Sequence, residues 1–600
     1  MTIFTRWFAW TRRILRHTAR LFVHVLFASA FALGTAFAAQ PDSKGTDFWL
    51  MFNGNLGTST LSLFITGDTP ATGTVAIPGL GFSAPFSVTP GTVTTVTLPA
   101  AAAVTTVNTV EAKGIHVTSD EEVTVYGLNR VQFTTDAFLG LPTDILGTDY
   151  ITLGYRNVNI VNANQFGIVA AQDNTTVTIT PTVTTSGHAA GVPFNVMLNQ
   201  GQTYQLRDTN ASPSDLSGTP ISADKPIAVF GGHQCANIPQ GFVACDHIVE
   251  QMTPTSTWGQ SFVTVPLATR TGGDTFRVLA SADVTSVFVN GAMVATLNRG
   301  QIYENVLTAA STITADKPVM VAQYSNSSSF DNVTSDPFEV LIPPFEQFLP
   351  GYTITTPATG FATNFVNVAA PAGAVGAITL DGAPIPAGDF TPIGASGFSG
   401  AQVPITLGSH TLAGPLPFGV TTYGFASFDS YGYPGGLALA EVAELTSLTL
   451  APPSATNPVN TEHCVTATTL DQADDPLPGI RVDFSVTGAH TTGGFAFSDA
   501  AGEAEFCYTG TTAGMDTITA TVGNLSATAT KTWTDVQVAR CDVDGNGSVD
   551  IYDIRAIMAR RNAPATGPDD PADADGNGII DANDARQCTL QCDNARCAPN

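Results

Sequence analysis

Short runs of alternating apolar and polar residues fill the chain from Gly45 to Leu445. Gly, Pro, Asn and Asp separate these runs, as they do around Thr176–Ile179 and Val287–Val289. Such alternation is typical of strands with one buried face, because successive side chains point to opposite sides of a sheet. Strong helical periodicity is absent, so the region is predicted to be all-β.

Related phrases recur along this region at intervals of roughly 100 residues, a length that suits a small β-sandwich. The clearest pair is ISADKPIAVFGG from Ile221 and ITADKPVMVAQY from Ile313, with VTSDEEVTVYGL from Val117 as an earlier relative. Solenoid repeats are shorter, at roughly 20–50 residues. We therefore expect three or four degenerate sandwich-like repeats. A propeller-like region with two blades per repeat is the alternative.

A second β-rich module is expected at residues 446–538. Its alternating strands, which include CVTATTL and DAAGEAEFCYTG, have the spacing that an Ig-like β-sandwich requires. Cys464 and Cys507 are expected on facing strands. A disulfide between the two sheets follows if their Cα atoms come within roughly 6 Å.

The final segment, residues 539–600, is predicted to be a small α-helical tail. Ile554, Ile557 and Met558 have helical spacing after a first Asp-rich loop. The stretch ANDARQCTLQC after a second loop predicts a shorter helix.

Residues 1–39 have the pattern of a signal peptide. A basic segment with five arginines precedes a mostly apolar run from Leu21 to Phe37, and Ala36-Phe37-Ala38 provides small residues for cleavage. We expect cleavage after Ala38 or Ala39, with an uncleaved anchor as the alternative. No later run has the roughly 20 apolar residues of a membrane helix. The mature chain is therefore expected outside the cytoplasm, secreted or at the surface of a bacterial cell by way of the periplasm.

The charge of the chain limits its partners. The formal net charge is -27, while only 12% of the residues are charged and 43% are hydrophobic. A strongly acidic surface repels nucleic acid phosphates and anionic membranes, so neither is an expected partner. Calcium is a natural partner for such a surface.

Eight cysteines fall into groups that are close in sequence, and even groups in an exported protein indicate disulfides. We predict the pairs Cys235–Cys245 and Cys464–Cys507. The other four cysteines allow three connectivities, with zinc binding as the alternative: Cys541, Cys588, Cys592 and Cys597.

Two loops of 12 residues carry the most specific chemical signal. They are DVDGNGSVDIYD, Asp542–Asp553, and DADGNGIIDAND, Asp573–Asp584. Calcium takes six to eight oxygen ligands, and a loop of this length supplies them from positions 1, 3, 5, 7, 9 and 12. We predict two Ca²⁺ ions, for which magnesium is a poorer fit. Gly547 and Gly578 stand at position 6, where the chain turns sharply.

The predicted ligands of the first ion are Asp542, Asp544, Asn546, the carbonyl of Ser548, Asp550 directly or through water, and Asp553. Those of the second ion are Asp573, Asp575, Asn577, the carbonyl of Ile579, Asp581 and Asp584. Val549 and Ile580 at position 8 are expected to pair across the two loops and form a small core. A tail of about 60 residues buries little apolar surface, so calcium binding and folding are expected to be coupled.

Other clusters are interpreted as structural. Asp246, His247 and Glu250 lie beside Cys245, with His233 nearby, but their spacing is not that of a zinc-binding His-Glu-x-x-His site. Neither a Gly-x-Ser-x-Gly elbow nor a nucleotide-binding fingerprint occurs. We therefore expect no enzymatic activity, and a polysaccharide hydrolase is the second hypothesis.

Three segments between Gly45 and Leu445 resemble the IgGFc-binding-protein N-terminal domain family. They are GTDFWLMFNGN from Gly45, the block from Gln234 to Pro266 with its CDHIVEQ and Trp-Gly, and GFASFDSYGYPGG from Gly424. The resemblance implies a secreted, non-catalytic binding or adhesion region. Its family name refers to antibody Fc, an activity that we do not transfer to this chain.

The other two modules also resemble known families. Residues 446–538 are similar to bacterial Ig-like domains of the invasin type. The segment GEAEFCYTGTTAGMDTITA carries this similarity, which implies that the module acts as a spacer. Residues 539–600 resemble a type I dockerin, which implies a cohesin-like receptor reached through loop positions 10 and 11. Those positions differ between the loops: Ile551-Tyr552 and Ala582-Asn583. This difference argues against two equivalent docking modes.

The combined prediction is a secreted or cell-surface binding or adhesion protein with a calcium-stabilised, dockerin-like C-terminus. Its expected ligand is an extracellular glycoprotein, a polysaccharide or a cell-surface molecule. The tail acts either as a structural cap or as the anchor to a cohesin-like receptor. A dockerin-bearing component of polysaccharide degradation and a structural stalk protein are the alternatives.

Overall fold

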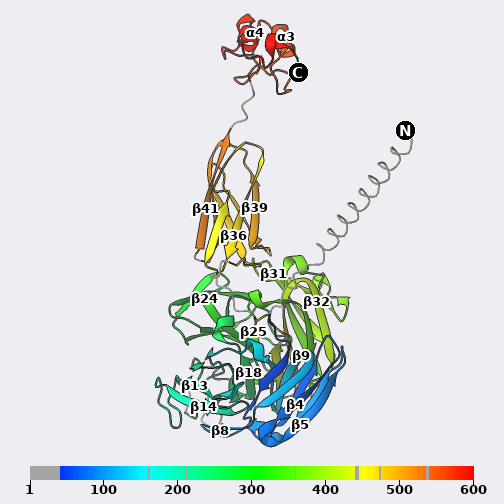
Figure 1. Cartoon of the computed structure of the whole chain (residues 1–600), viewed down its shortest axis with the longest axis vertical. Coiled ribbons are helices and arrows are strands. Elements are labelled where there is room, and N and C mark those ends of the chain that lie inside the picture. Colours follow the sequence, from blue (N-terminus) through cyan, green and yellow to red (C-terminus); the bar gives the residue numbers. More distant parts are fainter. Residues whose placement is uncertain are drawn as a thin grey trace, which may run out of the picture. The chain divides into compact units, whose positions relative to one another are not determined.

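The computed structural model describes residues 41–599 except 158–162, 211–212, 359, 440–444, 472–474, 500, 524 and 535–539. The predicted signal peptide, residues 1–39, lies outside the described residues. The chain divides into two compact units, Met1–Val442 and Ala443–Asn600, and strands dominate it up to the helical tail (Figure 1). The predicted all-β fold class is therefore confirmed.

The first unit opens with a module of seven main strands. Its long strand β9 belongs to two sheets: the first half pairs with β1 and β4, and the second half pairs with β3 and β10. Strands β5 and β6 extend the two sheets at their edges. The strands are β1 (Gly45–Leu50), β3 (Thr60–Thr66), β4 (Ala71–Ile77), β5 (Phe82–Val88), β6 (Thr94–Leu98), β9 (Ile115–Val131) and β10 (Thr134–Gly140).

Three further modules repeat this order of pairing. The second has β11 (Asp149–Ile151), β12 (Asn164–Ala170), β13 (Thr175–Ile179), β14 (Phe194–Leu198), β15 (Thr203–Arg207), β16 (Pro220–Ala223), β17 (Ile227–Ala236) and β18 (Asp246–Met252). The third has β19 (Gly259–Thr264), β20 (Asp274–Ala280), β21 (Thr285–Val289), β22 (Ala292–Leu297), β23 (Ile302–Leu307), β24 (Ser311–Tyr324) and β25 (Glu339–Ile342). The fourth has β26 (Leu349–Thr355), β27 (Thr363–Pro371), β28 (Thr379–Leu380), β29 (Ala383–Pro384), β30 (Thr391–Pro392), β31 (Phe398–Ile405), β32 (Ser409–Ala426) and β33 (Asp429–Pro434).

The repeats are sandwiches rather than pairs of propeller blades. In the first module both sheets contribute to one core, with Leu63 of β3 and Phe138 of β10 from one sheet and Val75 of β4 from the other. The same holds in the fourth module, where Ile354, Val368 and Leu412 share a core. The repeated Asp-Lys-Pro sequence lies within the long strand β24 of the third module. In the second module it falls between β16 and β17, which together take the place of that long strand. The described part of the first unit thus holds four copies of the sandwich.

The last strands of the four modules meet inside the unit. Strand β10 packs beside β18 and β33, and β25 packs beside the same two strands. Every residue of these four strands is buried. We call them the central strand cluster. Because they come from successive modules, this cluster joins all four.

The unit is closed by contact between its first and last described residues. The Ser43 amide donates to the Leu437 carbonyl at 3.0 Å, and the Leu439 amide donates to the Pro41 carbonyl at 2.7 Å. In Figure 1 the blue first module and the yellow-green fourth module accordingly lie side by side. Closure means that the fourth module has neighbours on both sides, as the others do.

The second unit begins with an Ig-like sandwich around Phe484, Ile518 and Trp533. One sheet has the order β34-β36-β39 and the other β35-β41-β40-β37-β38. The strands are β34 (Ser447–Ala451), β35 (Ser454–Pro458), β36 (Glu462–Leu470), β37 (Arg481–Gly488), β38 (Thr492–Phe497), β39 (Glu503–Thr509), β40 (Gly514–Val522) and β41 (Leu525–Thr534).

The Cys464–Cys507 disulfide is present, but the prediction that it joins the two sheets was wrong. Strands β36 and β39 are neighbours in one sheet, and the two cysteines are directly opposite in its register. Their Cα atoms are 4.0 Å apart, as expected for a non-hydrogen-bonded antiparallel pair. The alternation of apolar and polar residues predicts which face of a strand each cysteine side chain occupies. It does not predict which strands lie next to each other in a sheet.

The tail has two short helices, α3 (Ile551–Ala559) and α4 (Ala582–Thr589), as its helical spacing predicts. Two short strands, β42 (Ala563–Pro564) and β43 (Ile579–Ile580), pair with each other. None of the helices described in either unit has the length and hydrophobicity needed to span a bilayer.

Candidate metal centres in the tail

Both Asp-rich loops are shaped by their own side chains. In the first loop, the Asp542 carboxylate accepts hydrogen bonds from the amides of Asn546 at 3.1 Å and Gly547 at 2.9 Å. In the second loop, the Asp573 carboxylate accepts the equivalent bonds from Asn577 at 3.1 Å and Gly578 at 2.9 Å. Asp and Asn readily form such turns because their short side chains reach nearby backbone amides. The two loops therefore share one geometry.

Glycine is required at the sharp turn of each loop. Gly545 and Gly547 have φ angles of 71° and 84°, and Gly576 and Gly578 have φ angles of 70° and 87°. This left-handed conformation is accessible to glycine without the penalty that a Cβ atom brings. The turn directs the surrounding carboxylates inward.

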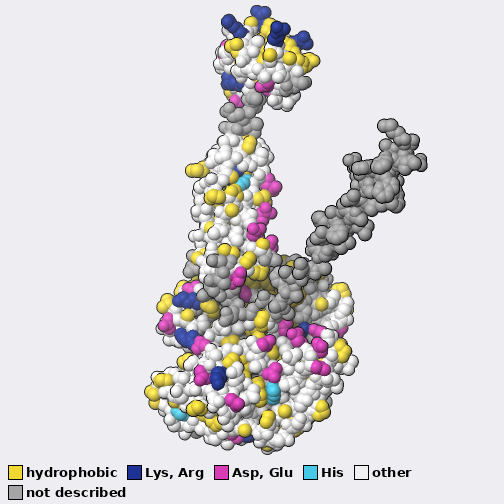
Figure 2. Space-filling view, viewed as in Figure 1, with side chains coloured by type: hydrophobic (Ala, Val, Ile, Leu, Met, Phe, Trp, Pro, Cys, Tyr) yellow, Lys and Arg dark blue, Asp and Glu magenta, His cyan; other side chains and the backbone are white. Residues whose placement is uncertain are grey.

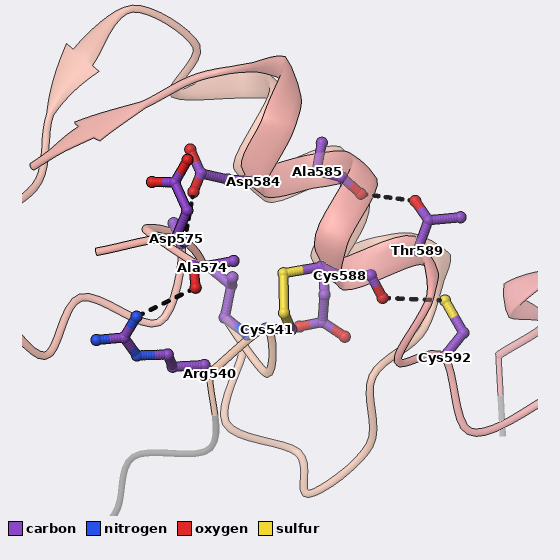
Figure 3. The surroundings of a disulfide bond; sticks show 12 residues. Arg540, Cys541, Ala574, Asp575, Asp584, Ala585, Cys588, Thr589 and Cys592 are labelled. Atoms are coloured by element: carbon purple, nitrogen blue, oxygen red, sulfur yellow. Dashed lines mark hydrogen bonds between the residues drawn. A yellow bond between two sulfur atoms is a disulfide. The ribbon is translucent and has the colours of Figure 1, made fainter. Parts of the chain in front are cut away.

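Three carboxylates converge in each loop, at positions 1, 3 and 12. One oxygen from each of Asp542, Asp544 and Asp553 lies within 4.8 Å of the others. The same holds for Asp573, Asp575 and Asp584, two of which appear in Figure 3. Such crowding of like charges is unfavourable unless a cation neutralises it. The donors are all oxygens, which is the ligand type that calcium prefers.

The carboxylate at position 12 also joins each loop to its helix. Asp553 accepts hydrogen bonds from the amides of Val543 at 2.7 Å and Asp550 at 2.9 Å. Asp584 accepts from Asp575 at 3.1 Å and Asp581 at 2.8 Å. Asp553 and Asp584 are fully buried. They therefore link the proposed ion to the folding of the helix.

The residues at position 9 have a different role from the other predicted ligands. Asp550 and Asp581 are the N-caps of α3 and α4, and their side chains accept hydrogen bonds from the amides of Tyr552 and Asn583. They stand outside the two groups of converging carboxylates. In a loop of this type, position 9 often contacts calcium through a water molecule. The remaining predicted ligands also lie within the two loops: Asn546, Ser548, Asn577 and Ile579. The side-chain oxygen of each Asn accepts a hydrogen bond from the backbone amide two residues further along the chain.

Val549 and Ile580 lie in one small tail core, as predicted, but their backbones do not pair with each other. The backbone of Ile580 pairs with Ala563. The Val549 amide donates to the Asp593 carboxylate at 2.6 Å, and the Asp593 amide donates to the Val549 carbonyl at 3.1 Å. The segment after α4 thus provides the hydrogen-bond partners of the Val549 backbone.

Disulfides reinforce the tail. Cys541, directly before the first loop, is bonded to Cys588 in α4, with Cα atoms 5.1 Å apart (Figure 3). The second bond joins Cys592 to Cys597. Of the three connectivities that the sequence left open, this one connects the first loop to the helix of the second.

Two polar residues that sequence reasoning missed hold the entry to the second loop. The Arg560 guanidinium donates to both carboxylate oxygens of Asp570. Asp570 also accepts from the amides of Thr566 at 2.8 Å and Ala572 at 3.0 Å. Arg560 holds the pKa of Asp570 below its usual range. Their separation of ten residues follows no motif spacing, so only the folded chain reveals the pair.

The cluster near Cys245 is structural in its contacts. The predicted Cys235–Cys245 disulfide is present, with Cα atoms 5.0 Å apart. His233 and His247 are buried, and burial lowers the pKa of each to about 3, so both imidazoles are neutral. The His247 Nε2 atom lies 3.2 Å from the Asn129 side-chain amide. Asp246 and Glu250 are buried in β18, within the central strand cluster.

The comparisons with known proteins match two regions of the chain. Residues 136–424 match the family model described as IgGFc binding protein, and residues 447–534 match the bacterial Ig-like domain, group 1. The human IgGFc-binding protein is 29% identical over 324 residues, which are 52% of this chain and 6% of that protein. This chain therefore corresponds to a small part of its relative. Neither matched region includes the tail.

Similarity to solved structures is weak. The D0-D1 domain of intimin is 13% identical and covers 36% of this chain and 86% of its own, with a TM-score of 0.13. The tetra-tandem repeat in the extending region of a large adhesion protein is also 13% identical, covers 64% of this chain and 99% of its own, and has a TM-score of 0.13. Scores this low carry no argument about fold or function.

Proposed function

We propose that this chain is a secreted or cell-surface binding protein whose first unit recognises an extracellular glycoprotein or polysaccharide. The match of residues 136–424 to the IgGFc-binding family carries this proposal. The bacterial Ig-like match at residues 447–534 supports a surface or secreted protein with a spacer between its binding unit and its tail. A non-catalytic role fits both matches.

The binding proposal is tested with the full mature chain immobilised on a sensor. Human IgG Fc, the same Fc after deglycosylation, a mucin and an array of polysaccharides are offered as probes. We expect saturable binding of at least one probe without release of reducing ends. Failure of every probe to bind, or release of reducing ends, would contradict the proposal.

We propose that the tail binds two calcium ions and is folded by them. The two groups of three converging carboxylates support this, as does the small core, which relies on disulfides and polar contacts. Binding energy from a metal contributes to folding when the site forms only in the folded state. Isothermal titration of the full chain should show the two tail ions. They should be lost in the double variant Asp542→Ala with Asp573→Ala and retained in the exposed control Asp569→Ala.

A docking role for the tail is the second candidate, favoured by the surface of α3. Tyr552 and Met558 are 53% and 41% exposed, and Arg555 lies 6.0 Å from the Tyr552 ring centre. Basic side chains gather on the visible face of the tail, although the chain as a whole is strongly acidic (Figure 2). A receptor with an acidic, partly apolar surface would complement this face.

Docking is tested by capture of proteins secreted by the host on the immobilised full chain, with calcium and with EDTA. A receptor captured only with calcium, and lost in Tyr552→Ala but not in Asn583→Ala, would support docking through the first loop. Calcium-dependent folding with no captured receptor would leave the tail as a structural cap.

A further inference from the structure

Four turns lead into the strands of the central strand cluster, one from each module. Each turn connects the last two strands of its module, which pair antiparallel as a hairpin. We call these turns the rim loops, and the structure describes all of their residues: 132–133, 237–245, 325–338 and 427–428. Loops of this kind are where binding residues are most often carried on a rigid scaffold.

Hydrogen bonds join the first three rim loops at one end of the unit. Between the first and second modules, the His247 amide donates to the Thr134 hydroxyl at 3.0 Å, and both residues stand at the start of their strands. Between the second and third modules, the Ser327 amide donates to the Ile238 carbonyl at 2.6 Å. These loops therefore lie next to each other.

Two further contacts close the ring of rim loops. Between the third and fourth modules, the Ser430 hydroxyl donates to the Asp336 carbonyl at 2.7 Å. Between the fourth and first modules, the rings of Phe133 and Phe428 meet edge to face, with centroids 6.4 Å apart. The four rim loops thus form one continuous surface around the end of the central strand cluster.

Each rim loop brings a phenylalanine to this surface. Phe133 and Phe428 are 54% and 47% exposed. Phe242 and Phe330 are half-buried against each other, with ring centroids 4.9 Å apart, and Phe330 belongs to the short helix α2 (Ser328–Asp331). Val243, beside them, is 65% exposed. Single exposed apolar residues are ordinary, but apolar side chains grouped on one surface indicate a binding site.

The backbone at two of these phenylalanines is strained. Phe133 and Phe428 occupy the same position of a two-residue hairpin turn, with φ angles of 68° and 56°. Glycine or asparagine is usual in this left-handed conformation, which is costly for a bulky residue. Both rings are largely in solvent, so core packing does not account for them. Strain of this kind is often found at ligand-binding positions.

The rim loops expose no charged side chain, although the chain has a formal net charge of -27. Their charged residues are Asp331, whose side chain is 2% exposed and paired with Arg270, and Asp336, which is 3% exposed. The exposed polar side chains are neutral amides and hydroxyls: Gln132, Gln240, Ser329, Asn332, Thr334 and Ser427. The surface therefore combines aromatic rings with uncharged hydrogen-bonding groups.

We propose that the rim loops bind a neutral polysaccharide, an inference that rests on the proposed binding function of the first unit and assigns its site. The electron-rich face of an aromatic ring attracts the polarised C–H groups of a sugar ring, and neutral amides and hydroxyls bind its hydroxyl groups. A polysaccharide presents one sugar ring after another, as the four modules present one phenylalanine after another. An acidic polysaccharide is disfavoured, because the chain is strongly acidic and the rim loops expose no cation.

The test measures binding of the full mature chain to soluble neutral polysaccharides by calorimetry, with a β-glucan, a mannan and a xylan as probes and polygalacturonate as the acidic comparison. The double variant Phe133→Gly with Phe428→Gly removes two rings where glycine suits the backbone, so the first unit should stay folded in circular dichroism. We expect binding to weaken by at least about tenfold, because a few aromatic residues usually contribute most of the binding energy.

Two other double variants serve as controls. Phe133→Tyr with Phe428→Tyr keeps both rings and should retain binding. Met197→Ala with Met293→Ala removes side chains that are 67% and 58% exposed on β14 and β22, away from the rim loops, and should also retain it. In the unaltered chain, the bound polysaccharide should slow hydrogen exchange in peptides that cover the rim loops.

The outcomes separate this inference from the proposed function. Undiminished polysaccharide binding by the glycine variant, or unchanged exchange in the rim loops of the unaltered chain, would place the site elsewhere and leave the proposed function standing. Binding of Fc or mucin without any neutral polysaccharide, or binding of polygalacturonate alone, would refute the ligand class. Failure to bind any of these probes would overturn both proposals.

Discussion

The Asp136 carboxylate is the most connected group in the central strand cluster, and replacing it with asparagine tests how the four modules are held together. Its Oδ1 atom accepts hydrogen bonds from the amides of Ala137 at 2.8 Å and Gly432 at 3.3 Å. Its Oδ2 atom accepts from Val249 at 3.0 Å and Glu339 at 3.2 Å. One carboxylate thus receives a backbone amide from each module. Burial raises the pKa of Asp136, and these four amides oppose the rise.

The expected cost of Asp136→Asn follows from this geometry. An amide side chain has the same shape but only one acceptor oxygen, so in either orientation two backbone donors face its NH₂ group. Each buried donor left without a partner costs about 1–3 kcal/mol. We therefore expect a loss of about 2–6 kcal/mol in the stability of the first unit. Since domains are typically stable by about 5–15 kcal/mol, this loss is large.

The assay is hydrogen exchange of the full chain across a series of urea concentrations, read from peptides of the first unit. Reading by peptide separates this unit from the Ig-like domain and the tail, since a chain with several domains does not unfold in two states. Asp224→Asn is the matched control. Asp224 is exposed, and its Oδ1 accepts one amide, from Thr176 at 2.8 Å, a contact that asparagine keeps.

The control is expected to change stability by less than about 0.5 kcal/mol. If Asp136→Asn also changes it by less than about 1 kcal/mol, the four amides contribute little net stability. The view of Asp136 as the group that joins the modules would then be wrong.

Four further predictions follow from the site and the cores. In calcium, the variant Asp542→Ala with Asp573→Ala should expose only the tail to limited proteolysis; continued calcium protection of that tail would refute the ligand assignment. Burial raises the pKa of Asp336 to about 7 and that of Asp429 to about 6, above their unfolded value of 3.8, so in EDTA the stability that these two residues contribute is greatest at low pH and is lost as pH rises through about 6–7. Urea unfolding that is independent of pH over this range, without calcium, would argue against that coupling. In the Ig-like domain, burial acts to raise the pKa of Asp516, but hydrogen bonds from His490, Trp533 and Tyr508 outweigh it and leave the pKa lowered. Stability from Asp516 should therefore be present above pH about 4 and be lost on further acidification, and Asp516→Asn should remove this dependence in circular dichroism melts. Peptide mapping without reduction should recover Cys541 with Cys588; a Cys541–Cys597 peptide would exclude the connectivity described here.

Much of the tail was accessible from sequence because its ligands lie within 12 residues of one another. Asp542, Asp544 and Asp553 converge through turns that their own side chains create. Local spacing also identified the Cys235–Cys245 pair and the helix at Ile554–Met558. It did not identify Arg560 with Asp570, whose contact depends on how the second loop begins.

The sequence by itself determined the strands, the repeats and the calcium-loop motif, since alternation, turn residues and ligand spacing are local properties of the chain. The tertiary structure alone decided which strands are neighbours. It placed Cys464 and Cys507 in one sheet, and it made Asp593 the hydrogen-bond partner of the Val549 backbone. It also brought the amides of Val249, Glu339 and Gly432 to the Asp136 carboxylate, from modules about 100 residues apart. Contacts at such separations depend on the packing of whole sandwiches, which no short pattern encodes.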